Sequence, residues 1–129
     1  MNIKLYKQQI SELGVEGFHL EPKSLMEATS LLTKLKEYQK VLKQIKFNIR
    51  IDARKIRKEY INNIEKVNES LKNNKKTDKK ARMAIKLLKI EKDEKIAPYD
   101  VLDNLIDNYI IQIEDSKIFL REYIKNQMK

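Results

Sequence analysis

The side chains of this sequence that could do chemistry are mainly basic, and the densest cluster lies in LKNNKKTDKKARM, residues 71–83. Six bases and a single acid stand in this stretch. Such a cluster can hold phosphate groups without reading a base sequence, and its binding would weaken steeply with salt. A solvated turn between two helices, or a docking site for an acidic protein, would have the same composition. The candidate anion-binding residues here are Lys72, Lys75, Lys76, Lys79, Lys80 and Arg82.

A second basic patch lies in RIDARKIRK, residues 50–58. Its members are Arg50, Arg54, Arg57 and Lys58. Their spacing predicts one side of a helix that could meet the phosphates of a duplex. One side of that helix should be buried, because the apolar residues Ile49, Ala53 and Ile56 lie in or next to the same stretch. The simpler interpretation is that the four bases are ordinary solvated residues on the exposed side. Residues 62–97 contain no Phe, Tyr or Trp, so the stacking platforms of single-strand binders are missing there.

Signals for enzymatic chemistry are weak. His19 is the only histidine and no E-x-x-H pattern accompanies it, so a metal site built on helices is not expected. Two glycines are too few for a P-loop or a dinucleotide-binding loop, and no serine stands in a G-x-S-x-G context. Asp103 and Asp107 could share a cation, although a solvated acidic face is the commoner meaning of such a pair. We therefore expect no enzyme, no cofactor and no metal site.

A long helix is predicted over residues 24–71. Ser24 and Glu27 fit the S-x-x-E pattern that caps a helix N-terminus. Behind them apolar residues recur at every third or fourth position, with an average step of about 3.5 residues, the period of a left-handed coiled coil. The predicted seam is Leu25, Ala28, Leu32, Leu35, Tyr38, Leu42, Ile45, Ile49, Ala53, Ile56, Tyr60, Ile64, Val67 and Leu71.

The second arm should begin after a turn at residues 73–77, because the Asn and Asp of the stretch NNKKTD, residues 73–78, favour turn conformations. Helices are expected over residues 78–96 and 98–128, with a break or kink where Pro98 lacks a backbone donor. At ~1.5 Å per residue both arms are about 70 Å long. The predicted fold is therefore all-α, a long antiparallel helical hairpin. Because the two arms have about the same length, residue i should lie opposite a residue near 150 − i. We expect residues 1–129 to form a single helical domain.

Residues 1–23 stand apart as a short N-terminal strap that holds both glycines. We expect a short helical face followed by an extended segment. The helical face is Ile3, Tyr6 and Ile10, and the extended segment runs through Val15, Phe18 and Leu20.

Charge is distributed unevenly around the net value of +9. No base lies between Lys95 and Lys117, whereas this interval holds five acids. In the predicted hairpin these acids lie opposite bases of the first arm, which suggests ion pairs that set the register. The acids are Asp100, Asp103, Asp107, Glu114 and Asp115, and the bases are Lys36, Lys40, Lys43, Lys46 and Arg50.

The last helix carries more apolar residues than one helical partner can cover. The strap or another subunit should cover the remainder, and we expect self-association as a homodimer. The candidate interface residues are Val101, Leu105, Ile111, Ile118, Phe119 and Tyr123.

These features favour a non-enzymatic interaction, scaffold or assembly protein that acts through coiled-coil packing. The alternative is a non-specific nucleic-acid-binding protein that uses the two basic clusters, and an enzyme or small-molecule carrier is a third hypothesis. There is no Cys, no signal-peptide pattern and no stretch near the ~20 apolar residues of a membrane span. We therefore expect a cytoplasmic protein.

Overall fold

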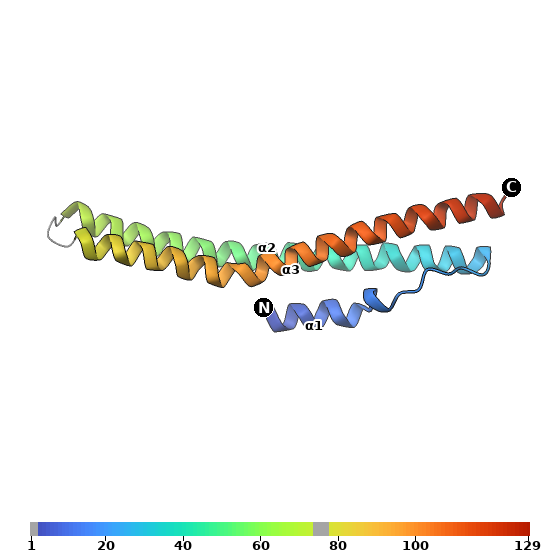
Figure 1. The fold of residues 1–129 in the computed structure, drawn as a ribbon, viewed down its shortest axis with the longest axis horizontal. Coiled ribbons are helices and arrows are strands. Elements are labelled where there is room, and N and C mark those ends of the chain that lie inside the picture. Colours follow the sequence, from blue (N-terminus) through green and yellow to red (C-terminus); the bar gives the residue numbers. More distant parts are fainter. Residues whose placement is uncertain (1–2, 74–77) are drawn as a thin grey trace.

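The computed structural model describes residues 3–73 and 78–129, with side chains over 3–70 and 79–129. It confirms the all-α prediction. The elements are α1 (Ile3–Leu13), a single 3-10 turn η1 (Val15–Gly17), α2 (Leu25–Asn73) and α3 (Asp78–Gln127). The helices α2 and α3 pack antiparallel as a hairpin, and α1 lies alongside it (Figure 1).

The start of α2 follows from its capping residues. The Oγ of Ser24 accepts a hydrogen bond from the backbone N–H of Glu27 at 3.1 Å. The carboxylate of Glu27 accepts one from the backbone N–H of Lys23 at 3.3 Å, one residue before the usual capping-box partner. Two backbone donors that the helix cannot satisfy are thus bonded, and the predicted N-terminus is confirmed.

The seam between α2 and α3 forms the core. On α2 most of the predicted residues are buried or half-buried, while Leu25 in the first turn is exposed. Leu71 lies outside the described side chains. The buried apolar residues of the two arms are Ala28, Leu35, Leu42, Ile45, Ile49, Ala53 and Tyr60, and Ile96, Leu102, Ile106, Tyr109, Ile113 and Leu120.

Pro98 lies inside α3, so the two helices expected over 78–96 and 98–128 are one continuous helix. The proline deprives the carbonyl of Glu94 of its intrahelical donor. Glu94 and Pro98 are both exposed, so water can serve that carbonyl and the helix can continue. Figure 1 shows α3 changing direction in its orange middle part, as a helix does at an internal proline. The proline therefore kinks α3 and does not end it.

The N-terminal segment docks on the hairpin, with Tyr6 and Ile10 buried against it. Gly14 ends α1 with a φ of 76°, a left-handed conformation that favours glycine. The chain then passes through η1 into an extended stretch that packs on the core. The half-buried side chains of this stretch are Val15, Phe18 and Leu20.

The hairpin is thicker over its base, the half that contains the start of α2 and the end of α3, than toward its tip (Figure 1). At the base, α1 and the extended stretch form a third layer over the core cluster. Beyond Tyr60 on α2 and before Ile96 on α3, the described seam residues are only half-buried. Two helices alone leave a seam partly open to water. The tip half therefore has less apolar burial than the base.

Replacing Ile106 by Ala tests this core. Ile106 is fully buried in the base, so its truncation should lower the free energy of unfolding by about 2–5 kcal/mol. The matched control is Ile61→Ala on the exposed side of α2, where the loss should stay below about 1 kcal/mol. Urea unfolding followed by circular dichroism at 222 nm measures both. Equal losses would contradict the assignment of Ile106 to the core.

Candidate interaction surfaces

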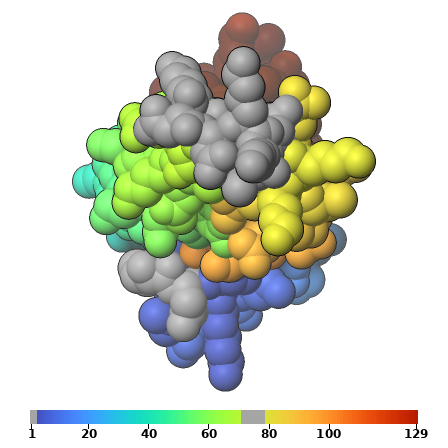
Figure 2. All heavy atoms as spheres, turned by 90° about the vertical axis from the view of Figure 1, so that its left-hand side faces the viewer, coloured from blue at the N-terminus to red at the C-terminus, as the bar shows by residue number. Residues whose placement is uncertain are grey.

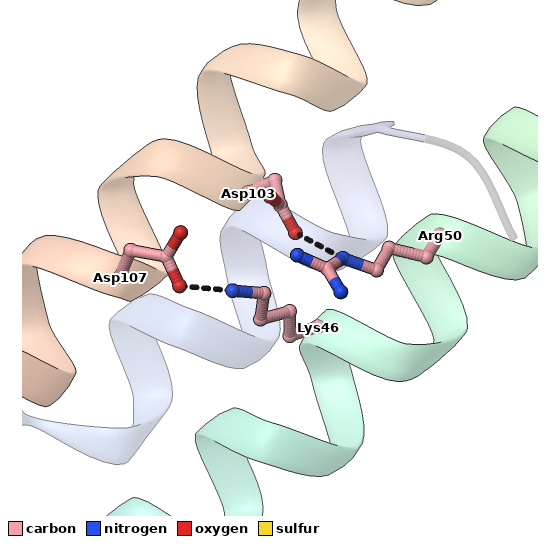
Figure 3. A network of polar contacts seen from close by, with 4 residues as sticks. All are labelled: Lys46, Arg50, Asp103 and Asp107. Atoms are coloured by element: carbon pink, nitrogen blue, oxygen red, sulfur yellow. Dashed lines mark hydrogen bonds and ion pairs between the residues drawn. The ribbon is translucent and has the colours of Figure 1, made fainter.

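Two ion pairs join α2 to α3 side by side near the middle of the hairpin (Figure 3). Lys46 pairs with Asp107, and the Nε of Arg50 lies 3.3 Å from Oδ1 of Asp103. The acidic interval of α3 does therefore face the basic interval of α2. The register differs from the prediction by nearly one helical turn, since Arg50 was expected opposite Asp100. The shift arises because side-chain packing sets the register, and arm lengths estimate it only coarsely.

A buried polar cluster lies next to these pairs. The Nζ of Lys117 donates to Oε1 of Gln39 at 3.0 Å and to Oε1 of Glu114 at 3.3 Å, and Gln39 also donates to Glu114. Gln39 and Lys117 are both buried. The hydrogen bonds from Gln39 and then Lys117 lower the pKa of Glu114. None of the predicted seam residues belongs to this cluster. Gln39 follows the predicted seam residue Tyr38, and apolar periodicity does not indicate that a base such as Lys117 is buried.

Two tyrosines fasten the N-terminal segment to the hairpin through carboxylates. The hydroxyl of Tyr6 on α1 donates to Asp52 on α2, and the hydroxyl of Tyr109 on α3 donates to Glu16 in η1. Burial, and then the bond to Glu16, raises the pKa of Tyr109 to about 12. Burial and the bond to Asp52 raise the pKa of Tyr6 as well. Burial alone would raise the pKa of Asp52, but hydrogen bonding, first from Tyr6, outweighs it and lowers that pKa.

The residues that could have bound a metal ion are not gathered into one site. Asp103 and Asp107 are each taken by a base of α2, and His19 is exposed. Within residues 3–73 and 78–129 no group of three or more His, Asp or Glu side chains could hold a metal ion. The cavity between α1 and α3, beside Ile10 and Tyr109, measures about 140 Å³, below the ~300–1,000 Å³ usual for small-molecule sites. An open groove between α1 and α2, beside Val41 and Ile45, measures about 620 Å³.

The two basic clusters are placed differently. At the tip, Lys79, Lys80 and Arg82 are exposed. Lys75 and Lys76 lie outside the described residues, and the side chain of Lys72 is not described either. In the 50–58 patch, Arg50 is bound to Asp103, whereas the other three bases are exposed. These are Arg54, Arg57 and Lys58, of which the two arginines border a groove with Tyr99, Asp100 and Asp103 on its far side.

Five of the six candidate interface residues are exposed on α3. Val101 is the most open, with 65% of its surface accessible. The sixth, Tyr123, is half-buried and packs against the core, so it belongs to the hairpin seam. The five exposed residues are Val101, Leu105, Ile111, Ile118 and Phe119. Exposed apolar side chains on α3 thus continue along its C-terminal half.

Searches against protein-family models, curated proteins and solved structures find no match to this chain. Over their described residues, neither long helix contains an apolar stretch long enough to cross a membrane. The surfaces of the hairpin are therefore the source for a functional inference.

The tyrosine–carboxylate bonds predict a defined pH dependence. Because folding raises the pKa of both tyrosines above the ordinary value near 10, their stabilisation is complete below pH ~10 and is lost as the pH rises above it, for Tyr109 toward its pKa of about 12. The double variant Tyr6→Phe, Tyr109→Phe lacks this contribution. Wild type should exceed it by about 2–4 kcal/mol at pH 8, and the difference should shrink steadily above pH 10.

Urea unfolding of both proteins from pH 8 to 12 measures that difference. Lysine deprotonation in the same range affects both proteins equally and cancels in the comparison. A difference that stays constant to pH 12 would contradict the two bonds.

Proposed function

We propose that this protein is a non-enzymatic helical interaction protein that assembles through coiled-coil packing and associates with itself. The observation that carries the proposal is the row of exposed apolar side chains on α3. Isolated exposed apolar residues are normal on a protein surface, but a contiguous set along one helix marks an interaction site. The hairpin itself supports this role, since a rigid pair of long helices presents a long, regular surface.

Sedimentation equilibrium tests self-association. The wild-type chain should form dimers at micromolar concentration, and the triple variant Val101→Gln, Ile111→Gln, Ile118→Gln should be monomeric. Gln keeps a high helix propensity, so the helix should survive these changes. The matched control replaces Phe47 and Ile61, which are exposed on α2, by Gln, and should remain dimeric.

The outcome that contradicts self-association is a wild-type monomer up to about 100 μM, a concentration at which ~5 kcal/mol of association energy suffices. Circular dichroism of each variant checks that the hairpin is intact. A loss of helicity in the triple variant would require the milder change Ile111→Gln alone, with the same expected direction.

A second candidate function is non-specific binding to the phosphate backbone of nucleic acids. The specific observation is that Arg54, Arg57 and Lys58 are exposed and that, among the described residues, none of the three forms an ion pair. The exposed Lys79 and Lys80 at the tip add further positive charge. Because residues 62–97 contain no aromatic side chain on which a nucleobase could stack, the tip would bind nucleic acid through its charge and without sequence preference.

Fluorescence anisotropy with a short duplex tests this candidate. The variant Arg54→Gln, Arg57→Gln, Lys58→Gln should bind more weakly at low salt, with the slope of log K against log salt reduced by about 3. The control removes the same charge from exposed lysines elsewhere on α2, by changing Lys36, Lys43 and Lys66 to Gln. Equal losses in both variants would indicate a bulk charge effect, and no binding at low salt would exclude the candidate.

A further inference from the structure

The outer face of α3 carries a second heptad seam, distinct from the one that packs on α2. From residue 83 to residue 118 its positions alternate in steps of four and three, as the a and d positions of a coiled coil do. Polar residues occupy four positions of this seam: Glu94, Asn104, Asn108 and Asp115. Its apolar members, all exposed, are Met83, Leu87, Ile90, Ala97, Val101, Ile111 and Ile118.

This pattern indicates what kind of partner the face takes. A seam of about five heptads is longer than the three or four that define a coiled coil, so the occupant is another helix that runs nearly along α3. The exposure is large: 59% of Met83, 58% of Leu87 and 59% of Ile111. The apolar groove beside Leu87 and Ile90 extends the same surface toward the tip.

The charge along α3 identifies the partner. Residues 79–97 carry seven bases and three acids, whereas residues 98–116 carry five acids and no base. A second α3 that runs in the opposite direction places each basic half beside an acidic half, although Asp103 and Asp107 are partly neutralised by α2. A parallel copy would place like charges together. The helix is thus complementary to itself only in the antiparallel sense.

We propose that two copies of this chain associate through the outer seams of their α3 helices, antiparallel, with the two-fold axis near Tyr99. This inference rests on the self-association proposed above and specifies its geometry. In this register Leu87 lies against Ile111 of the second copy, and Val101 against Ala97. Glu94 meets Asn104, whose amide can donate to the carboxylate, so two of the polar seam positions satisfy each other.

The arrangement also compensates for the unequal thickness of the hairpin. The antiparallel pairing lays the thin tip half of each copy, which has no third layer among its described residues, beside the thick base of the other. Figure 2, viewed from the tip, shows α1 below the two arms, so the outer side of the yellow part of α3 is left uncovered by α1. Close to the axis the two Asp100 side chains repel each other, and salt screens that repulsion.

Distances between spin labels test the geometry, because the chain has no cysteine to interfere. Single cysteines replace Lys86, Asp100 or Gln112, which flank the outer seam and leave it intact. In the antiparallel dimer the label pairs at 86 and at 112 should lie about 40 Å apart, and the pair at 100 below about 20 Å, from the helical rise. Sedimentation of each labelled variant confirms that it is still a dimer.

Short distances at all three positions would mean a parallel dimer and would overturn the inference. Long distances at all three would place the dimer on another face, which overturns the inference and leaves the proposed self-association standing. A wild-type monomer would contradict both. The variant Leu87→Gln gives an independent measure, because Leu87 lies in the tip half of α3 and is not one of the exposed candidate interface residues between Val101 and Phe119. This change should weaken the dimer by more than roughly tenfold. The control Met26→Gln, on α2, should leave the affinity unchanged, and an unchanged Leu87→Gln dimer would overturn the inference.

Discussion

The heptad seam between α2 and α3 is the interaction on which the rest of the structure depends. Most helical stability in proteins comes from the packing of an apolar face, and burial of Leu42, Ile49 and Ile106 in this seam supplies the main driving force. Apolar packing of this kind specifies which faces meet but tolerates sliding by a heptad. The pairs Lys46–Asp107 and Arg50–Asp103, and the buried Lys117 with Gln39, restrict that sliding to one register.

The N-terminal segment depends on that register in turn. Tyr6 reaches Asp52 on α2, and Glu16 reaches Tyr109 on α3, so the segment contacts both arms at once. A hairpin shifted by one turn would separate these acceptors from their donors. The segment thereby adds a third layer at the base only. The long arms give the molecule an extended surface, and its tip half is the least covered part among the described residues (Figure 1).

The surface of the described residues carries both charged and apolar side chains. The acids of α3 that could have held a cation are occupied by Lys46 and Arg50, and the single histidine lies at the surface of the N-terminal segment. The described residues also expose bases such as Arg54 and Arg57, isolated apolar side chains on α2, and the apolar outer seam of α3. The seam extends over five heptads, whereas the bases of residues 54–58 cover little more than one helical turn. Because a seam of this length favours a helical partner, we propose protein assembly ahead of nucleic-acid binding.

The sequence by itself determined the all-α class, the capped start of α2 at Ser24, the α2 seam and a distinct N-terminal segment, whose docking on the hairpin the structure decided. These features depend on local propensity and on a repeat of 3.5 residues, which a single chain displays directly. Tertiary structure alone decided that α3 continues through Pro98, that Arg50 pairs with Asp103 and that Tyr123 packs inward. It also decided that Met83, Leu87 and Ile90 face outward. Each of these depends on which side of a helix is covered by another segment, and periodicity shows that a stripe exists without showing what lies against it.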